Sequence, residues 1–263
     1  MNYGKKVLGL VLLGALSSGA AQAALHDRGG GLVYDDVLDV TWLADANYAK
    51  TSGYDADGLM TWQQAVTWAA NLSYHDSVRG VTYDDWRLPM VRDGGLADYN
   101  YTYSGTDIGY NVRTVGEDGT VYSELAHMYF NNLGFKSDFS PSGGIQSDGG
   151  IFGDDAYHWG EARSGLGPNG AIQNLQSYAY WSGTAYAPVP GLYAWGVNTD
   201  VGYQGSSYQY NGLHAWAVRP GDVAAVSEPV PAALFGVGLA GLMLARRLSK
   251  NLTPVVAGKH GTI

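Results

Sequence analysis

The strongest structural signal in this chain is a series of β-prone runs that ends at Gly221. Large side chains alternate with small ones over residues 193–199, which is the pattern of a strand with one buried face. Further β-prone runs cover residues 178–187, 203–210 and 213–219. Asn211-Gly212 separates the last two runs and favours a type I′ turn, because both residues accept a positive φ. We therefore predict an antiparallel meander whose aromatic face closes the core.

One helix and two short strands are predicted ahead of this meander. Thr61 and Gln64 have the spacing of a capping box, which marks the start of a helix. Apolar side chains follow at helical spacing, so we expect a helix over residues 61–74 with one buried face and with Trp68 at the border of that face. Two predicted strands, joined by an aspartate-rich turn, cover residues 32–34 and 40–43.

A second helix is predicted over residues 124–133, with Ser123 as its N-cap and Gly134 as its C-cap. Residues 136–174 are mostly Gly, Ser, Asp and Asn, and such a long segment without regular structure is either a binding surface or mobile. Two helices followed by an antiparallel sheet, whose last strand can pair with the first strand of the chain, define an α+β fold. Six tryptophans are assigned to the core: Trp42, Trp62, Trp86, Trp181, Trp195 and Trp216.

The first 23 residues have the pattern of a secretory signal peptide. Lys5 and Lys6 precede an apolar run over residues 7–16, and small residues follow up to the A-x-A pattern that ends at Ala23. The run is too short to span a bilayer, and its flanks are those of a cleaved signal. We therefore expect export, with cleavage after Ala23 and a mature protein that begins at Ala24.

Residues 227–250 combine an apolar run with a basic end. The run covers residues 230–245, and these 16 residues fall just short of the ~17–25 that span a bilayer. The basic pair would lie on the cytoplasmic side of a membrane, which keeps residues 24–226 outside. The segment resembles the PEP-CTERM sorting signal, an apolar helix between a short motif and a basic cluster that an exosortase processes. The residues that carry this resemblance are Ser227, Glu228, Pro229, Arg246 and Arg247. Ser227 replaces the usual first proline, and a tail over residues 251–263 follows the basic cluster.

The part of the chain between these segments, residues 24–226, is strongly acidic. It contains nine of the 15 Lys and Arg residues and 23 of the 24 Asp and Glu residues, which gives a net charge of −14. Such a field disfavours nucleic acid and other polyanions as partners. The chain has no cysteine, so the exported protein has no disulfide and relies on packing or bound ions for stability. Its length suits one compact domain.

Six aromatic motifs occur along residues 25–223. They are Arg28-Gly-Gly-Gly-Leu-Val-Tyr34, Thr41-Trp42, Thr61-Trp62, Asp85-Trp86-Arg87-Leu88-Pro89, Tyr180-Trp181-Ser182-Gly183-Thr184 and Ala215-Trp216-Ala-Val218-Arg219-Pro220-Gly221. Together and in this order they resemble the Lcl C-terminal domain family, which is grouped with C-type-lectin-like and formylglycine-generating-enzyme-like folds. The resemblance implies two helices that flank a mixed or antiparallel sheet, with a long Gly- and Tyr-rich loop region. It also implies a surface adhesion or glycan-binding module.

One activity of that fold group is excluded by composition. Formylglycine-generating enzymes need reactive cysteines that bind copper and activate oxygen, and this chain has none. The histidines between the two end segments show no H-x-x-x-H or similar metal-ligating spacing. We therefore expect no catalysis. Scattered Ser, His and Asp residues leave a hydrolase with a nucleophile–base–acid triad as a less favoured alternative.

Aromatic side chains in two loops are the candidate ligand-binding residues. Tyr99, Tyr101, Tyr103 and Tyr110 lie in a stretch rich in Tyr, Gly and Asn, and Trp159 lies in the Gly-rich segment. Exposed aromatics on loops are often binding features, and sugar rings stack on them. The alternative is that these rings fold back and close their own loops. We predict a module at the cell surface or in the extracellular matrix that binds extracellular polysaccharide, and an inert structural surface protein is the alternative.

Calcium is the candidate cofactor. Asp55 and Asp57, with Gly58 for the turn, resemble the start of a loop that binds Ca²⁺ through oxygen ligands. The alternative is a pair of solvated turn aspartates, and the same two interpretations apply to the clusters Asp35, Asp36 and Asp39 and Asp84 and Asp85. Arg87 and Arg219 lie in Trp-Arg and Arg-Pro contexts beside many carboxylates. We expect buried ion pairs there, structural rather than catalytic.

Overall fold

The computed structural model describes residues 25–96 and 99–223. They belong to the first of the two compact units into which the chain divides, Met1–Val223 and Ala224–Ile263. The predicted signal peptide, sorting segment and tail lie outside the described residues. Within the two described ranges, no helix is long and apolar enough to cross a membrane.

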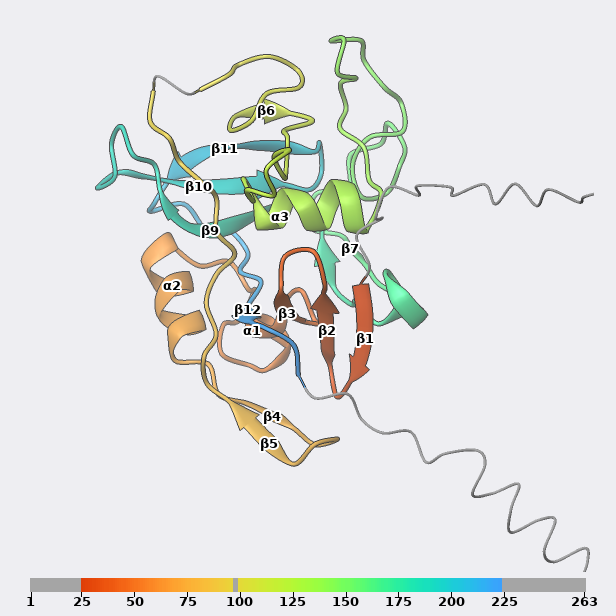
Figure 1. The fold of residues 1–263 in the computed structure, drawn as a ribbon, viewed down its shortest axis with the longest axis vertical. Helices are drawn as coiled ribbons and strands as arrows, with labels where there is room; N and C mark the ends of the chain where they lie inside the picture. Colours follow the sequence, from red (N-terminus) through yellow and green to blue (C-terminus); the bar gives the residue numbers. More distant parts are fainter. Residues whose placement is uncertain (1–24, 97–98, 224–263) are drawn as a thin grey trace, which may run out of the picture. The chain divides into compact units, whose positions relative to one another are not determined.

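The N-terminal strands form an antiparallel sheet that a strand from the end of the described chain completes (Figure 1). Its order is β1-β2-β3-β12. These strands are β1 Leu25–Gly29, β2 Leu32–Asp35, β3 Val40–Leu43 and β12 Val218–Pro220. Every residue of β3 is buried, and β12 pairs with β3 through Val218 opposite Trp42. The two predicted N-terminal strands are therefore confirmed. The last strand joins their sheet, but it pairs with β3, so the predicted pairing with the first strand is wrong.

A second antiparallel sheet contains the predicted meander, in the order β6-β11-β10-β9. Its strands are β6 Gly109–Tyr110, β9 Ala179–Ala185, β10 Tyr193–Asn198 and β11 Tyr203–Tyr208. Helix α3 (Glu124–Ala126) lies along one face of this sheet (Figure 1). Leu125 and Met128 from the helical segment line one small internal space together with Tyr180 and Val197 from the sheet. This face is therefore part of the core.

The predicted hairpin at Asn211-Gly212 is wrong. Neither residue has a positive φ, and the run after them does not pair with β11. Leu213 instead exchanges two backbone hydrogen bonds with Met60, at 2.9 and 3.0 Å. His214 bonds to the edge of β9, and Val218 begins the strand of the other sheet. A local turn preference was outweighed by partners that are distant in sequence.

The first predicted helix is present as α2, Trp62–Ala70. The Thr61 N–H donates to Gln64 Oε1 at 2.9 Å, as the capping box predicts. The helix ends before the expected limit, because Asn71 leaves the helical conformation at φ −104° and ψ 5°. Trp68 is fully buried, and its expected place at the border of the apolar face is wrong.

The second predicted helix begins as α3 and continues as a π-helical segment, His127–Asn132. Ser123 Oγ accepts a hydrogen bond from the Ala126 N–H at 3.2 Å, so it is the N-cap that we predicted. Gly134 follows with a φ of +68°, which is the left-handed conformation of a helix C-cap. A short helix that was not predicted, α1 Tyr48–Thr51, precedes α2.

The remaining regular structure is limited to two small sheets and one turn. Their bounds are β4 Tyr74–Asp76 with β5 Val81–Tyr83, β7 Ala162–Arg163 with β8 Leu175–Gln176, and a 3₁₀ turn over Pro168–Gly170. Residues 136–174 contain β7 and this turn and are otherwise irregular, as their composition predicts. The architecture is a mixed α+β fold built mostly from antiparallel strands.

Five of the six tryptophans assigned to the core are buried, namely Trp42, Trp86, Trp181, Trp195 and Trp216. Trp62 is half-buried at the start of α2, where its Nε1–H donates to the Ser182 carbonyl at 2.8 Å. Trp195 belongs to a separate small apolar cluster with Val91 and Ile108. The core assignment is thus confirmed for all except Trp62, which lies at the core edge.

Both predicted ion pairs are present. Arg87 Nη1 lies 2.6 Å from Glu124 Oε2, and Arg219 Nε lies 2.7 Å from Asp85 Oδ1. Only Glu124 is buried, because Arg87 and Arg219 keep part of their surface in solvent and Asp85 is exposed. The expectation of fully buried pairs is therefore wrong.

Candidate functional site

A hollow of about 220 Å³ opens on one face of the β10–β11 pair, and we call it the β10–β11 hollow. Gly196 and Gly205 lie directly opposite each other in the two strands, so the middle of this face carries no side chain. A Cβ added at Gly196 would lie 2.7 Å from the Tyr180 carbonyl oxygen, which leaves no room for one. A Cβ at Gly205 would lie 2.6 Å from the Tyr203 ring and would displace that ring.

Two tyrosines, Tyr178 and Tyr203, line this hollow. The Tyr178 ring packs 5.5 Å from Trp159, and the Tyr203 ring packs 5.0 Å from Tyr110. Two of the predicted binding residues, Trp159 and Tyr110, therefore contact the rings that line the hollow. Burial raises the pKa of Tyr203 and of Tyr110, so both phenols are neutral hydrogen-bonding groups at physiological pH.

Polar groups complete the lining. Asn198 Oδ1 accepts a hydrogen bond from the Asp200 N–H at 2.9 Å, and Ser207 Oγ accepts one from Asn211 Nδ2 at 2.9 Å. These contacts fix the two side chains. The Asn198 amide NH₂ and the Ser207 hydroxyl proton have no hydrogen-bond partner among the described residues, so both can donate to a ligand.

No charged residue lines this hollow, although residues 24–226 as a whole are strongly acidic. From Ser164 to Val218 the sequence contains a single Asp, Glu, Lys or Arg residue, which is Asp200. A second hollow, of about 270 Å³, is instead lined by Asp138, Asp154, Asp155 and Asp200. Burial and the nearby Asp200 raise the pKa of Asp138 there. The β10–β11 hollow is therefore the one that suits an uncharged ligand.

Further tyrosines outside the hollow form a continuous row, which we call the tyrosine ladder. In spatial order its members are Tyr101, Tyr99, Tyr186, Tyr193, Tyr208 and Tyr210. Successive ring centroids are 6.4, 5.5, 6.2, 4.3 and 4.9 Å apart. The two ends of the row are its most exposed members, with Tyr101 68% and Tyr210 66% exposed. A hydrogen bond with Tyr208 raises the pKa of Tyr193 to about 12.

Asp93 fixes the inner part of the ladder. Its carboxylate accepts hydrogen bonds from the Tyr99 hydroxyl at 2.6 Å, from Trp195 Nε1 at 2.8 Å and from the Ala187 N–H at 2.6 Å. Burial alone would raise the pKa of Asp93, but these hydrogen bonds outweigh it and the pKa is lowered. One carboxylate therefore ties the loop that carries Tyr99 to the start of the β9–β10 connection.

The five predicted aromatic residues lie in three places. Tyr99 and Tyr101 belong to the ladder, and Trp159 packs on Tyr178. Tyr103 and Tyr110 stack on each other at 6.0 Å and both contact Phe139, which matches the alternative of rings that close their own loops. The strand tyrosines of the hollow and the ladder were not among the predicted binding residues. The period-two alternation that predicted the strands also contained the signal for which tyrosines share a face.

Asp55 and Asp57 lie in the turn before α2, and their carboxylates accept hydrogen bonds from backbone N–H groups. Asp55 Oδ1 accepts the Gly58 N–H at 2.7 Å, and Asp57 Oδ1 accepts the Leu59 N–H at 2.9 Å. This hydrogen bond lowers the pKa of Asp57. Among the described residues, no group of three or more His, Cys, Asp or Glu side chains has a metal-binding arrangement. Calcium binding at Asp55 and Asp57 stays a prediction.

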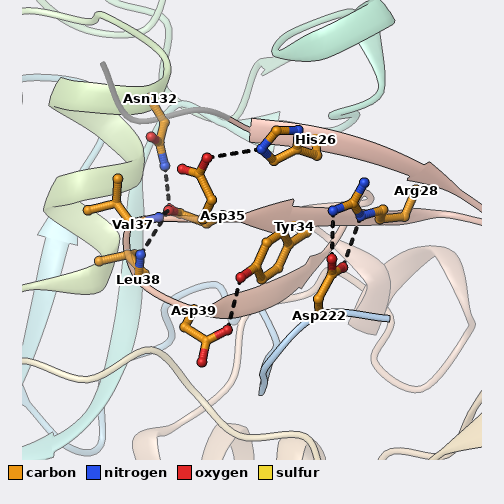
Figure 2. A network of polar contacts seen from close by, with 10 residues as sticks. His26, Arg28, Tyr34, Asp35, Val37, Leu38, Asp39, Asn132 and Asp222 are labelled. Carbon is orange, nitrogen blue, oxygen red and sulfur yellow. Dashed lines mark hydrogen bonds and ion pairs between the residues drawn. The ribbon is translucent and has the colours of Figure 1, made fainter. Parts of the chain in front are cut away.

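The aspartate-rich turn between β2 and β3 has a structural role that Figure 2 shows. The buried Asp35 accepts hydrogen bonds from the Val37 and Leu38 N–H groups, both at 3.0 Å, and from Asn132 Nδ2 at 2.6 Å. Asn132 belongs to the π-helical segment, so this carboxylate joins the helix to the N-terminal sheet. Asp39 adopts a φ of +51° and accepts the Tyr34 hydroxyl at 2.9 Å.

The two buried histidines are held by neutral oxygen atoms. His127 Nδ1 lies 3.2 Å from Thr114 Oγ1, and His214 Nδ1 lies 3.0 Å from the Gly58 carbonyl oxygen. Burial lowers the pKa of both imidazoles. These contacts orient both rings as packed, uncharged groups.

Comparisons with protein-family models, with curated proteins and with solved structures find no match to this chain.

Proposed function

We propose that this protein is an exported carbohydrate-binding or adhesion protein of the cell surface or extracellular matrix, without catalytic activity. The β10–β11 hollow is its binding site, and an uncharged glycan is its ligand. The observation that carries the proposal is a hollow with two tyrosine walls, Tyr178 and Tyr203, and a glycine floor, set in the uncharged part of an acidic chain.

The chemistry of the lining suits a sugar ring. A tyrosine ring has an apolar face that packs on the C–H face of a pyranose, while its hydroxyl bonds to a sugar hydroxyl. The Asn198 amide and the Ser207 hydroxyl supply the few placed polar groups that a binding site needs for orientation. An anionic polysaccharide would be repelled by the net charge of −14 on residues 24–226, whereas an uncharged polysaccharide would not.

The proposal includes a C-type-lectin-like fold and the export of the protein to the cell surface or extracellular matrix. Helices α2 and α3, two antiparallel sheets and the long irregular segment over residues 136–174 support a C-type-lectin-like arrangement. The signal peptide and the PEP-CTERM-like segment support export and processing by an exosortase. Such export places the hollow among extracellular polysaccharides, and the membrane contact of the C-terminal segment is then transient.

Native affinity electrophoresis tests the binding site. The full chain without its signal peptide is run through gels that contain dextran, hydroxyethylcellulose, galactomannan or the anionic alginate. We expect retardation by at least one of the three neutral polymers and none by alginate. Tyr203→Ala should weaken the binding about tenfold, or about 1.4 kcal/mol, because one wall of the hollow is lost. Gly205→Ala keeps both tyrosines and displaces only the Tyr203 ring, so it should weaken binding as well.

Tyr54→Ala is the matched control, because this exposed ring lies outside the hollow and outside the ladder. It should bind as the wild type does, and thermal melting confirms that each variant is folded. Unchanged mobility of the wild type in all four gels would contradict the proposal and would leave an inert structural surface protein. Release of reducing ends from a bound polymer would instead establish a hydrolase.

A further inference from the structure

The strand part of the tyrosine ladder, Tyr193 and Tyr208, and the β10–β11 hollow use opposite faces of the same two strands. Tyr193 lies directly opposite Tyr208, and Gly196 lies directly opposite Gly205. Successive side chains of a strand point to opposite faces, so the odd-numbered Tyr193 and the even-numbered Gly196 belong to different faces. The hollow and the end of the ladder that contains Tyr193, Tyr208 and Tyr210 therefore lie on different faces of the sheet.

The ladder is exposed at both ends, at Tyr101 in the loop before β6 and at Tyr208 and Tyr210 at the end of β11. Tyr208 is 39% exposed and stacks on Tyr210, with an angle of 20° between the ring planes. Val189 and Leu192, in the connection between β9 and β10, are exposed beside this part of the row. The exposed rings at the two ends of the row, Tyr101 and Tyr210, offer surface to a ligand. A row of this kind contacts several successive units of a linear polymer rather than one small ligand.

The charge around the ladder identifies the class of that polymer. Residues 99–106, 186–199 and 201–211 contain no Asp, Glu, Lys or Arg. Two carboxylates act on Tyr99: Asp93 is bonded to Tyr99 and Trp195, and Asp107 is buried. Because the ladder residues carry no charge, they do not attract ionic ligands. The ladder therefore favours an uncharged, polyhydroxylated polymer as its ligand.

We propose that the tyrosine ladder is a second carbohydrate-binding surface, and that one protein molecule therefore bridges two segments of a neutral polysaccharide. The inference rests on the proposed function of the β10–β11 hollow. Two sites on opposite faces cannot both be filled by one short straight segment, so they engage different chains or distant parts of one chain. Binding at the second site then raises the avidity and links polymer chains into a network.

Agglutination of polysaccharide-coated beads tests the bridging. Beads carry the neutral polymer that retards the wild type in affinity gels, and clumping is measured by turbidity at equal protein concentration. The wild type and the Tyr54→Ala control should clump the beads. Tyr208→Ser/Tyr210→Ser, which removes the exposed end of the ladder, should abolish clumping while the protein still sediments with the beads. Gly205→Ala should also abolish clumping, because the other site is then impaired.

Each outcome of this experiment has a distinct meaning. Wild-type binding without clumping, or full clumping by the ladder variant, overturns the bridging inference and leaves the hollow as the single site. Absence of wild-type binding overturns the proposed function, and bridging with it. Analytical ultracentrifugation at the assay concentration completes the test, with a monomer expected. A wild-type dimer that becomes a monomer in the ladder variant would show that the ladder binds a second copy of the protein, and would overturn the inference.

Discussion

Burial of the His214 imidazole among the rings of Tyr178 and Tyr180 lowers its pKa to about 4. The ring lies in the segment that runs beside β9, and its Nδ1–H donates to the Gly58 carbonyl oxygen. An unfolded histidine has a pKa of about 6.5, so the unfolded chain binds a proton here at a higher pH than the folded protein does. The free energy of unfolding therefore falls as the pH drops from about 6.5 toward 4.

Urea unfolding between pH 7 and pH 4.5 measures this effect. Below pH 6 the wild type should lose up to about 1.4 kcal/mol of stability per pH unit through His214. His214→Gln should lower the stability at pH 7 and reduce the dependence on pH by that amount. His75→Gln, at an exposed position on β4, is the control and should follow the wild type. Equal pH slopes for His214→Gln and the wild type would show that this imidazole does not resist protonation.

At the scale of the elements, helix α3 is attached to the rest of the fold through its first residue. The Glu124 carboxylate accepts both Arg87 Nη groups, at 2.6 and 2.8 Å, and the Met90 N–H at 2.7 Å. Arg87 in turn exchanges backbone hydrogen bonds with Val218 of β12, at 2.8 and 2.9 Å. One buried carboxylate therefore connects the helix, the 86–91 segment and the N-terminal sheet.

Glu124→Ala should destabilise the protein by about 3 kcal/mol, because it leaves the Arg87 guanidinium and the Met90 N–H without their acceptor. Asp85→Ala is the matched comparison, since it breaks the corresponding Arg219 ion pair at an exposed carboxylate. It should cost less than about 1 kcal/mol. Chemical unfolding of both variants gives the two values. Similar losses would mean that the two ion pairs are equally solvated in solution.

At the scale of the whole molecule, the proposal of export rests on the sequence patterns of the two end segments. If the protein is exported and processed as proposed, signal-peptide cleavage leaves a mature chain that begins at Ala24. Exosortase processing then cuts the chain near Pro229. Mass spectrometry of the secreted and membrane fractions measures both ends. Retention of Arg246 would favour a plain membrane anchor over exosortase processing. A peptide that covers residues 5–16, found in a soluble cytoplasmic pool, would contradict export.

The sequence by itself determined the features whose causes are local. β-prone runs between turn signals predicted β9, β10 and β11, and period-two alternation also predicted that β10 has a buried face. The capping box at Thr61 and the N-cap at Ser123 predicted where two helices begin, because each cap bonds to its own helix. The buried tryptophans were predictable for a similar reason, since large apolar side chains leave water in any fold of this size.

Tertiary structure alone decided the features that depend on which segments meet. A type I′ turn at Asn211-Gly212 is favourable in isolation, yet the segment after it does not pair with β11. Leu213 hydrogen-bonds to Met60 instead, and β12 pairs with β3. The β10–β11 hollow exists because the register sets Gly196 opposite Gly205, and a shift by one residue would remove it. The tyrosines of the hollow and the ladder converge from segments that are up to about a hundred residues apart. Such distances are fixed by packing, which no local pattern encodes.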